Sequence, residues 1–83
     1  MKSRRLSEKD VAKLMELENL LQRVILKKGR LKTIPNSESR IEKGLQIQQA
    51  LTRSMIWLEK GFRGKLGEEL SLLRDLGIKF REN

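Results

Sequence analysis

Apolar residues at helical spacing limit this chain to an all-α fold. In the first part of the sequence they stand three or four positions apart at Leu14, Leu17, Leu21 and Val24, which places them on one side of a helix. Further apolar residues widen that stripe: Val11, Met15, Leu20, Ile25 and Leu26. Ser7 has the character of an N-cap, with Asp10 three positions on, and Gly29 that of a helix stop. The sequence therefore predicts a first helix over about residues 8–28.

A second helix is expected after the single proline, Pro35. Ser39 and Glu42 have the spacing of a capping box, and Gly61 is a natural stop, so the helix should cover about residues 40–60. Its mostly apolar pattern has two adjoining lines: Leu45, Gln48, Leu51, Met55, Leu58 and Phe62 on one, and Ile47, Ala50, Ser54 and Trp57 on the other. Because one neighbouring helix cannot cover both lines, a third helix or another subunit must pack there.

A short third helix over about residues 65–76 is the candidate for that position. Its leucines recur at helical spacing: Leu66, Leu70, Leu73 and Leu76. Gly77 and Ile78 resemble a Schellman stop, with Ile78 returning onto Leu73. Glycines at 61, 64 and 67 predict a loose connection, so this helix can pack on its own hairpin or exchange with a neighbour. We expect one small helical domain over residues 1–83, with a basic N-terminal arm at 1–6 and a C-terminal tail at 77–83.

Composition narrows the possible functions. The chain has no Cys and no His, so it lacks the usual proton shuttle and the commonest metal ligands. We expect no catalysis, no metal and no cofactor. The 19 basic residues outnumber the 11 acidic ones, giving a net charge of +8, which favours nucleotides, nucleic acid or an anionic membrane as partner. The first helix also carries four acidic residues, which disfavours a membrane surface. No apolar run is long enough to span a bilayer, and a cytoplasmic location is expected.

The basic residues concentrate in an acid-free stretch between Glu18 and Glu38. It contains Arg23, Lys27, Lys28, Arg30 and Lys32, more cations than compensation of a helix dipole requires. An antiparallel hairpin would bring this stretch beside Arg40 and Lys43. Arg40 would also stand in the first turn of a helix, where free N–H groups favour anions. The other end of the hairpin would gather a second basic group: Lys2, Arg4, Arg5, Lys60, Arg63 and Lys65. Phosphate contacts are therefore predicted for Arg40, Arg30, Lys27, Lys28 and Lys43.

Short motifs in the two long helices resemble those of a known family. Leu6-Ser7-Glu8-x-x-Val11 opens the first helix and Ser39-Arg40 the second, which contains Ala50-Leu51-Thr52 and Met55-Ile56-Trp57-Leu58-x-Lys60. Over roughly residues 4–62 the chain is similar to phage anti-CBASS cyclic-oligonucleotide sponges with a helical hairpin domain. The resemblance implies a non-enzymatic homo-oligomer, hexameric in that family, that sequesters cyclic di- and trinucleotides in pockets between subunits. The location would then be the host cell cytoplasm.

The resemblance also implies roles for individual residues. Arg40 matches the basic residue of the family's Ser-Arg pair, which implies a phosphate contact. The family's tyrosine before the first helix has no counterpart, because this chain has no Tyr; Arg4 and Arg5 stand nearby and are added to the predicted phosphate contacts. The family's Met-Trp-x-x-Lys region suggests packing between subunits. We assign the interface to Ile47, Met55, Ile56, Trp57 and Phe62.

Two other functions stay open on the sequence alone. The same basic cluster would suit a small helical protein that binds the backbone phosphates of RNA or DNA. A helix-turn-helix is excluded, because the connection between the first two helices is too long. Alternatively, the outer face of the second helix, including Ile56 and Trp57, would suit an inhibitor that docks an acidic protein partner.

Overall fold

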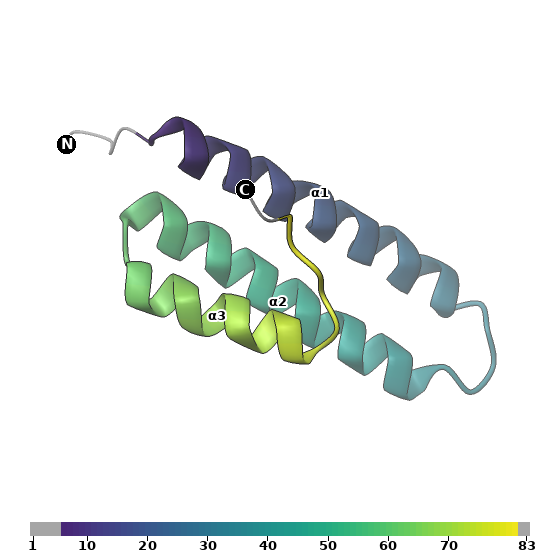
Figure 1. Cartoon of the computed structure of the whole chain (residues 1–83). Helices are drawn as coiled ribbons and strands as arrows, with labels where there is room; N and C mark the ends of the chain where they lie inside the picture. Colours follow the sequence, from purple (N-terminus) through teal and green to yellow (C-terminus); the bar gives the residue numbers. More distant parts are fainter. Residues whose placement is uncertain (1–5, 82–83) are drawn as a thin grey trace.

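Three helices form an all-α fold in the computed structural model, which describes residues 6–81. They are α1 (Glu8–Leu31), α2 (Glu38–Lys60) and α3 (Arg63–Asp75). Figure 1 shows α1 and α2 as an antiparallel hairpin, with α3 turning back alongside α2. Helix α2 packs against both α1 and α3. After α3 the chain crosses to α1 as an extended segment (Figure 1), so this segment bridges the two outer helices.

Three predicted helix ends are confirmed. The hydroxyl of Ser7 accepts a hydrogen bond from the Asp10 N–H at 3.2 Å and so caps α1. At the end of α2, Gly61 has φ +78° and the Phe62 N–H donates to the Trp57 carbonyl at 2.9 Å. At the end of α3, Gly77 has φ +100° and the Ile78 N–H donates to the Leu73 carbonyl at 2.9 Å. Both glycines adopt a left-handed conformation that has no steric cost without a Cβ.

Other boundaries differ from the prediction. Helix α1 passes through Gly29 and continues to Leu31. A glycine inside a helix costs only about 1 kcal/mol relative to alanine, and burial of the Leu31 side chain, 8% exposed, offsets that cost. Helix α3 begins at Arg63 rather than near residue 65, so Gly64 and Gly67 lie inside a helix and the expected loose connection is absent there.

The turn between α1 and α2 also corrects the prediction, since Ser37 rather than Ser39 stands at the N-cap position of α2. The buried Ser37 hydroxyl lies 2.6 Å from the Leu31 carbonyl and 2.7 Å from the Ile34 carbonyl, and donates towards them instead of capping α2. Asn36 supplies the reversal with φ +60°, a conformation that Asn tolerates better than most residues. The turn is therefore held by side-chain contacts to the end of α1.

The core forms around α2, whose inner residues contact both neighbours. Its buried apolar members come from all three helices: Leu17, Ile47, Ala50, Leu51, Leu58, Leu66 and Leu73. The expected stripe of α1 is confirmed for Leu14, Leu17, Leu21 and Val24, which are buried or packed against the core. The expected widening is mostly wrong, because Val11, Met15, Ile25 and Leu26 are 42–65% exposed. One face of α1 thus packs inward while apolar side chains also remain on its outer face.

Polar contacts fix α3 and the C-terminal segment in place. Arg53 donates two hydrogen bonds to Glu69, at 2.8 and 3.1 Å, linking α2 to α3. The Arg81 N–H donates to Glu16 at 2.6 Å, which attaches the C-terminal segment to α1. No helix within residues 6–81 combines the length and apolar character needed to cross a membrane.

Candidate anion-binding groove

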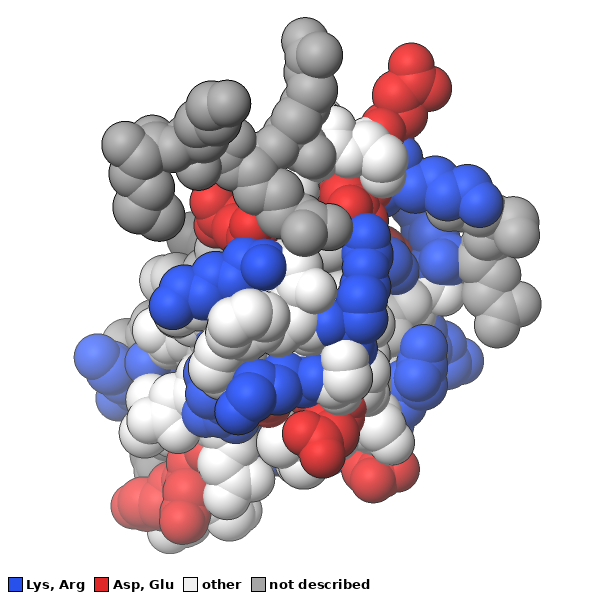
Figure 2. Space-filling model, turned by 90° about the vertical axis from the view of Figure 1, so that its left-hand side faces the viewer, with Lys and Arg blue, Asp and Glu red and all other residues white. Residues whose placement is uncertain are grey.

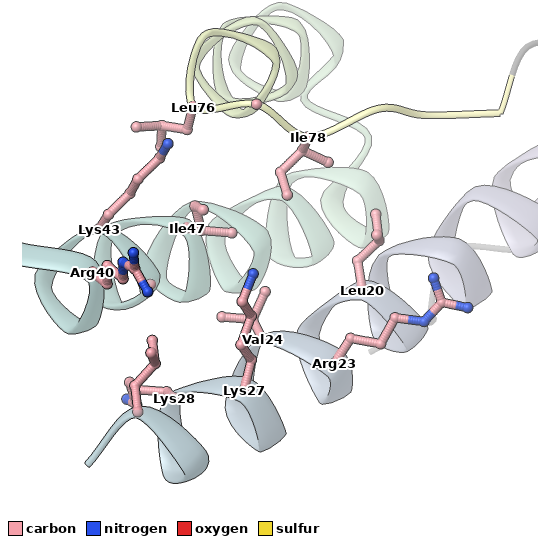
Figure 3. A pocket seen from close by; sticks show the side chains of 13 residues that line it. Leu20, Arg23, Val24, Lys27, Lys28, Arg40, Lys43, Ile47, Leu76 and Ile78 are labelled. Carbon is pink, nitrogen blue, oxygen red and sulfur yellow. The ribbon is translucent and has the colours of Figure 1, made fainter. Parts of the chain in front are cut away.

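A groove of about 590 Å³ lies between the C-terminal half of α1, the N-terminal half of α2 and the segment that follows α3. Its lining residues are Leu20, Arg23, Val24, Lys27, Lys28, Leu31, Arg40, Lys43, Gly44, Ile47, Leu76, Gly77 and Ile78. Figure 3 shows these side chains arising from three parts of the chain around one opening. The volume falls within the range of about 300–1,000 Å³ typical of small-molecule sites.

The lining of this groove contains five cations and no acid. Helix α1 contributes Arg23, Lys27 and Lys28, and helix α2 contributes Arg40 and Lys43. Helical spacing explains their convergence, because residues three or four positions apart share one side of a helix. In Figure 3 Arg40 extends into the space between α1 and α2, whereas Arg23 extends along α1, away from Lys27 and Lys28. Like charges at such a site repel one another unless an anion lies between them.

Apolar side chains cover the rest of the groove surface. Leu20 and Val24 come from α1, Ile47 from α2, and Leu76 and Ile78 from the segment after α3. Ile47 is only 8% exposed and belongs to the core, so this surface is fixed by the packing of the helices. Charged groups above an apolar surface fit a ligand that has anionic groups and a flat or apolar body.

Two local features orient the basic residues. The Lys28 ammonium donates a hydrogen bond to the Gln48 side-chain oxygen at 2.7 Å, which draws Lys28 across to α2. Arg40 lies in the first turn of α2, where backbone N–H groups lack helical partners and the helix dipole is positive. Ser37 leaves these N–H groups without a side-chain cap. The cationic side chains and the positive end of α2 thus lie at the same end of the molecule.

The groove brings together most of the predicted phosphate contacts. Arg40, Lys27, Lys28 and Lys43 all line it, and Arg30, although close in sequence, does not. The phosphate contacts predicted for Arg4 and Arg5 fall outside residues 6–81. Arg23 was recognised only as part of the acid-free stretch, and the contribution of residues 76–78 was not foreseen. The available signal in the sequence was the alternation of apolar and basic residues over positions 78–81; in the structure Ile78 and Phe80 pack against the core.

The residues assigned to an oligomer interface occupy different environments. Ile47 is already covered by its own chain, and Met55 packs against the core. Trp57 faces α3: its indole N–H lies 3.3 Å from a Glu69 oxygen and donates towards it, and its ring stacks on Phe62 with centroids 5.7 Å apart. Ile56 and Phe62 remain 42% and 47% exposed. A partner docking on this side of α2 would therefore meet Ile56 and Phe62 before Trp57.

The opposite end of the molecule carries Lys60, Arg63 and Lys65 of the second predicted basic group; the other members, Lys2, Arg4 and Arg5, lie outside residues 6–81. Figure 2 shows Lys and Arg side chains there interspersed with Asp and Glu. Arg63 donates to both carboxylate oxygens of Asp10, at 2.9 and 2.8 Å. The Lys65 ammonium lies 4.9 Å from the centroid of the Trp57 ring. These two cations already have partners within the chain, which favours the groove over this end as an anion site.

The groove offers charge and apolar surface rather than reactive groups. The sequence contains neither Cys nor His. Within residues 6–81 no three acidic side chains gather closely enough to hold a metal ion. Comparisons of the chain with protein-family models, with curated proteins and with solved structures each gave no match.

Proposed function

We propose that this protein binds and withholds a compact phosphate-bearing ligand of the cyclic oligonucleotide class, without transforming it. The observation that supports this most directly is the convergence of Arg23, Lys27, Lys28, Arg40 and Lys43 on one groove whose lining contains no acid. The resemblance of residues 4–62 to cyclic-oligonucleotide sponges points to the same ligand class.

Phosphate chemistry matches the cations available. An arginine can hold a phosphate through two parallel hydrogen bonds, and lysines act as mobile point charges around it. Both kinds of side chain line the groove from two helices. The repulsion among them would be relieved by a ligand with several negative charges held in a compact ring. Binding should therefore stabilise the folded chain as well as capture the ligand.

The apolar part of the groove suits the bases of such a ligand. Aliphatic side chains of Leu20, Val24 and Ile78 offer a flat apolar surface next to the charges. Duplex nucleic acid would leave this surface unused, because the flat faces of its bases are stacked inside the helix and only base edges and the backbone reach a protein. A ligand with exposed bases uses both parts of the groove.

Capture between copies of the chain is the second part of the proposal. The outer face of α1 carries the exposed side chains of Met15, Ile25 and Leu26, and Ile56 and Phe62 are exposed elsewhere. Where such side chains adjoin one another they form an apolar surface that favours self-association. We expect a homo-oligomer by sedimentation velocity, and a monomer at micromolar concentration would remove this part of the proposal while leaving the groove in place.

Calorimetry tests the ligand directly. Cyclic di-AMP and cyclic tri-AMP are titrated into the wild-type chain, into Arg40→Ala and into Arg30→Ala. Loss of Arg40 should weaken binding by about tenfold or more, as expected for a hydrogen bond between charged groups. Arg30→Ala removes the same charge from the same basic stretch but lies outside the groove lining, so it should bind nearly as the wild type does. Absence of heat with any cyclic nucleotide, from a folded protein, would reject the proposal.

A further inference from the structure

A second hollow adjoins the groove and shares two residues with it. This hollow, of about 360 Å³, is lined by Ala12, Lys13, Met15, Glu16, Asn19, Leu20, Arg23, Lys79 and Arg81. Leu20 and Arg23 line both hollows. In Figure 3 the Arg23 side chain extends away from the other groove cations, towards the N-terminal half of α1. Arg23 therefore stands at the junction of the two hollows.

The second hollow also carries a surplus of positive charge. Its four basic residues, Lys13, Arg23, Lys79 and Arg81, face a single acid, Glu16. That acid is already engaged, because it accepts hydrogen bonds from the Lys13 ammonium at 2.8 Å and from the Arg81 N–H at 2.6 Å. Within residues 6–81, Arg23, Lys79 and Arg81 form no salt bridge. The charges of Arg23 and Lys79 are therefore available to an anion from solution, and the charge of Arg81 interacts with Glu16 without forming a salt bridge.

The segment after α3 forms a wall common to both hollows. Leu76, Gly77 and Ile78 line the groove, and Lys79 and Arg81 line the second hollow. Phe80 anchors the segment between the two hollows. The centroid of its ring lies 4.9 Å from the Lys13 ammonium and 5.6 Å from the Arg74 guanidinium carbon. The packing of Ile78 and Phe80 against the core turns Lys79 and Arg81 outward.

We infer that the two hollows are subsites of one site, which holds a ligand with at least two separated phosphates. One phosphate would lie among Lys27, Lys28, Arg40 and Lys43, and another between Arg23, Lys79 and Arg81. Asn19, in the second hollow, adds a side-chain amide that can both donate to and accept from a base edge. This inference rests on the proposed function and specifies its ligand: a nucleotide with one phosphate can fill only one subsite.

A charge-matched pair of variants tests this. The double variant Lys79→Ala/Arg81→Ala removes two cations from the second hollow. Arg30→Ala/Lys60→Ala removes two exposed cations that line neither hollow. Both should fold, because the Arg81 contact to Glu16 is made by the backbone N–H. Calorimetry with adenosine monophosphate and with cyclic di-AMP is run on each protein and on the wild type.

The expected result is a selective loss. Lys79→Ala/Arg81→Ala should weaken cyclic di-AMP binding by about tenfold and change adenosine monophosphate binding by less than about twofold. The control variant Arg30→Ala/Lys60→Ala should change the affinity for both ligands by the same small factor. Equal effects of the two pairs on cyclic di-AMP would overturn the two-subsite inference while leaving the groove proposal standing. If neither nucleotide binds the wild-type chain, the proposed function itself fails.

A longer nucleic acid is the competing occupant, and salt distinguishes it. Single-stranded RNA bound along the two hollows would lose affinity steeply between 50 and 200 mM salt, with a slope of roughly −0.7 per phosphate contacted. A ligand with two phosphates has a correspondingly shallow slope. Binding of a ten-nucleotide RNA that is tighter than that of cyclic di-AMP at 150 mM salt would overturn the inference in favour of RNA.

Discussion

Arg63 grips both carboxylate oxygens of Asp10, at 2.9 and 2.8 Å, although the two residues are 53 positions apart in the sequence. Asp10 lies in the first turn of α1 and Arg63 is the first residue of α3. The pair joins the two helices that flank α2 at the end opposite the groove. Asp10 is buried, whereas the Arg63 side chain is largely exposed. Removing the arginine would therefore leave a buried carboxylate without its bidentate partner.

This relationship predicts an asymmetric response to mutation. Arg63→Ala should lower the midpoint of thermal unfolding, because the buried Asp10 carboxylate loses two charge-assisted hydrogen bonds. The double variant Arg63→Ala/Asp10→Ala should recover part of that loss, because the buried carboxylate that lost this bidentate partner is then removed as well. Circular dichroism melts of the two proteins and the wild type supply the comparison. A double variant less stable than Arg63→Ala would contradict the prediction.

Core packing predicts a sharp contrast between two neighbouring leucines in α3. Leu73 is fully buried and Leu72 is 40% exposed. Leu73→Ala should lower the free energy of unfolding by about 2–5 kcal/mol, because it leaves a cavity between α3 and α2. Leu72→Ala should cost less than about 1 kcal/mol. Urea unfolding followed by circular dichroism measures both, and similar losses would mean that α3 is not packed as described.

The continuation of α1 through Gly29 predicts a stabilising substitution. A Cβ at Gly29 would meet no atom within 4 Å, and its φ is not in the left-handed region. Gly29→Ala should therefore raise the free energy of unfolding by about 0.5–1 kcal/mol. Gly77→Ala provides the matched contrast, because φ +100° strains a residue with a side chain, and it should be destabilising. A destabilised Gly29→Ala would place the end of α1 before residue 31.

The pKa values of two glutamates predict loss of stability in acid. Hydrogen bonds from Arg53 lower the pKa of Glu69 against the opposing effect of partial burial. Partial burial acts to raise the pKa of Glu16, but the Arg81 N–H and the Lys13 ammonium together bring it below the ordinary value of 4.5. As pH falls, the unfolded chain takes up these protons first. The stabilisation is therefore present above about pH 4.5 and is lost as pH falls through the folded-state pKa values.

Urea unfolding at pH 7, 5 and 3 measures this loss, and Glu69→Gln serves as the comparison. The variant should be less stable than the wild type at pH 7, and the difference should shrink as pH falls towards 3, because the wild-type carboxyl is progressively protonated. A difference that stays constant across this range would show that the Arg53–Glu69 contact does not contribute to the pH dependence.

A larger side chain at position 44, where the chain has glycine, should close part of the groove without unfolding the chain. Gly44 lines the groove from the N-terminal half of α2, and a Cβ placed on it would meet no atom within 4 Å. Gly44→Leu should fill part of the groove and reduce cyclic di-AMP binding by about tenfold or more, while helix propensity favours folding. Gly67→Leu, at an equally open glycine of α3, should bind as the wild type does. Equal binding by both variants would place the ligand elsewhere.

Local sequence signals predicted the helices well where one residue type decides the conformation. Gly61 and Gly77 were predicted as helix stops because a left-handed residue with no Cβ is the cheapest way to end a helix. Gly29 misled the prediction because a helix tolerates a glycine when burial nearby, here of Leu31, offsets the cost. Ser39 was a plausible cap in isolation, but the tight turn through Asn36 and Ser37 starts α2 two residues earlier.

The candidate site was predictable only in part, for a similar reason. Lys27, Lys28, Arg40 and Lys43 could be grouped because a hairpin of two adjacent helices necessarily brings its turn end together. Lys79 and Arg81 could not, because their position depends on contacts between residues far apart, such as the Arg81 N–H with Glu16, 65 positions away. The alternation of apolar and basic residues over positions 78–81 is too short to reveal that the segment after α3 crosses to α1.

The extended segment after α3 has a consequence for the order in which the site is made. A ribosome delivers α1 and α2, with most of the groove's cations, before it delivers the residues that supply the third wall of the groove. During synthesis the basic face of the hairpin is thus open along one side. Only when Ile78 and Phe80 have emerged and packed against the helices is the groove complete, so the proposed binding surface forms after the hairpin that supplies its charges.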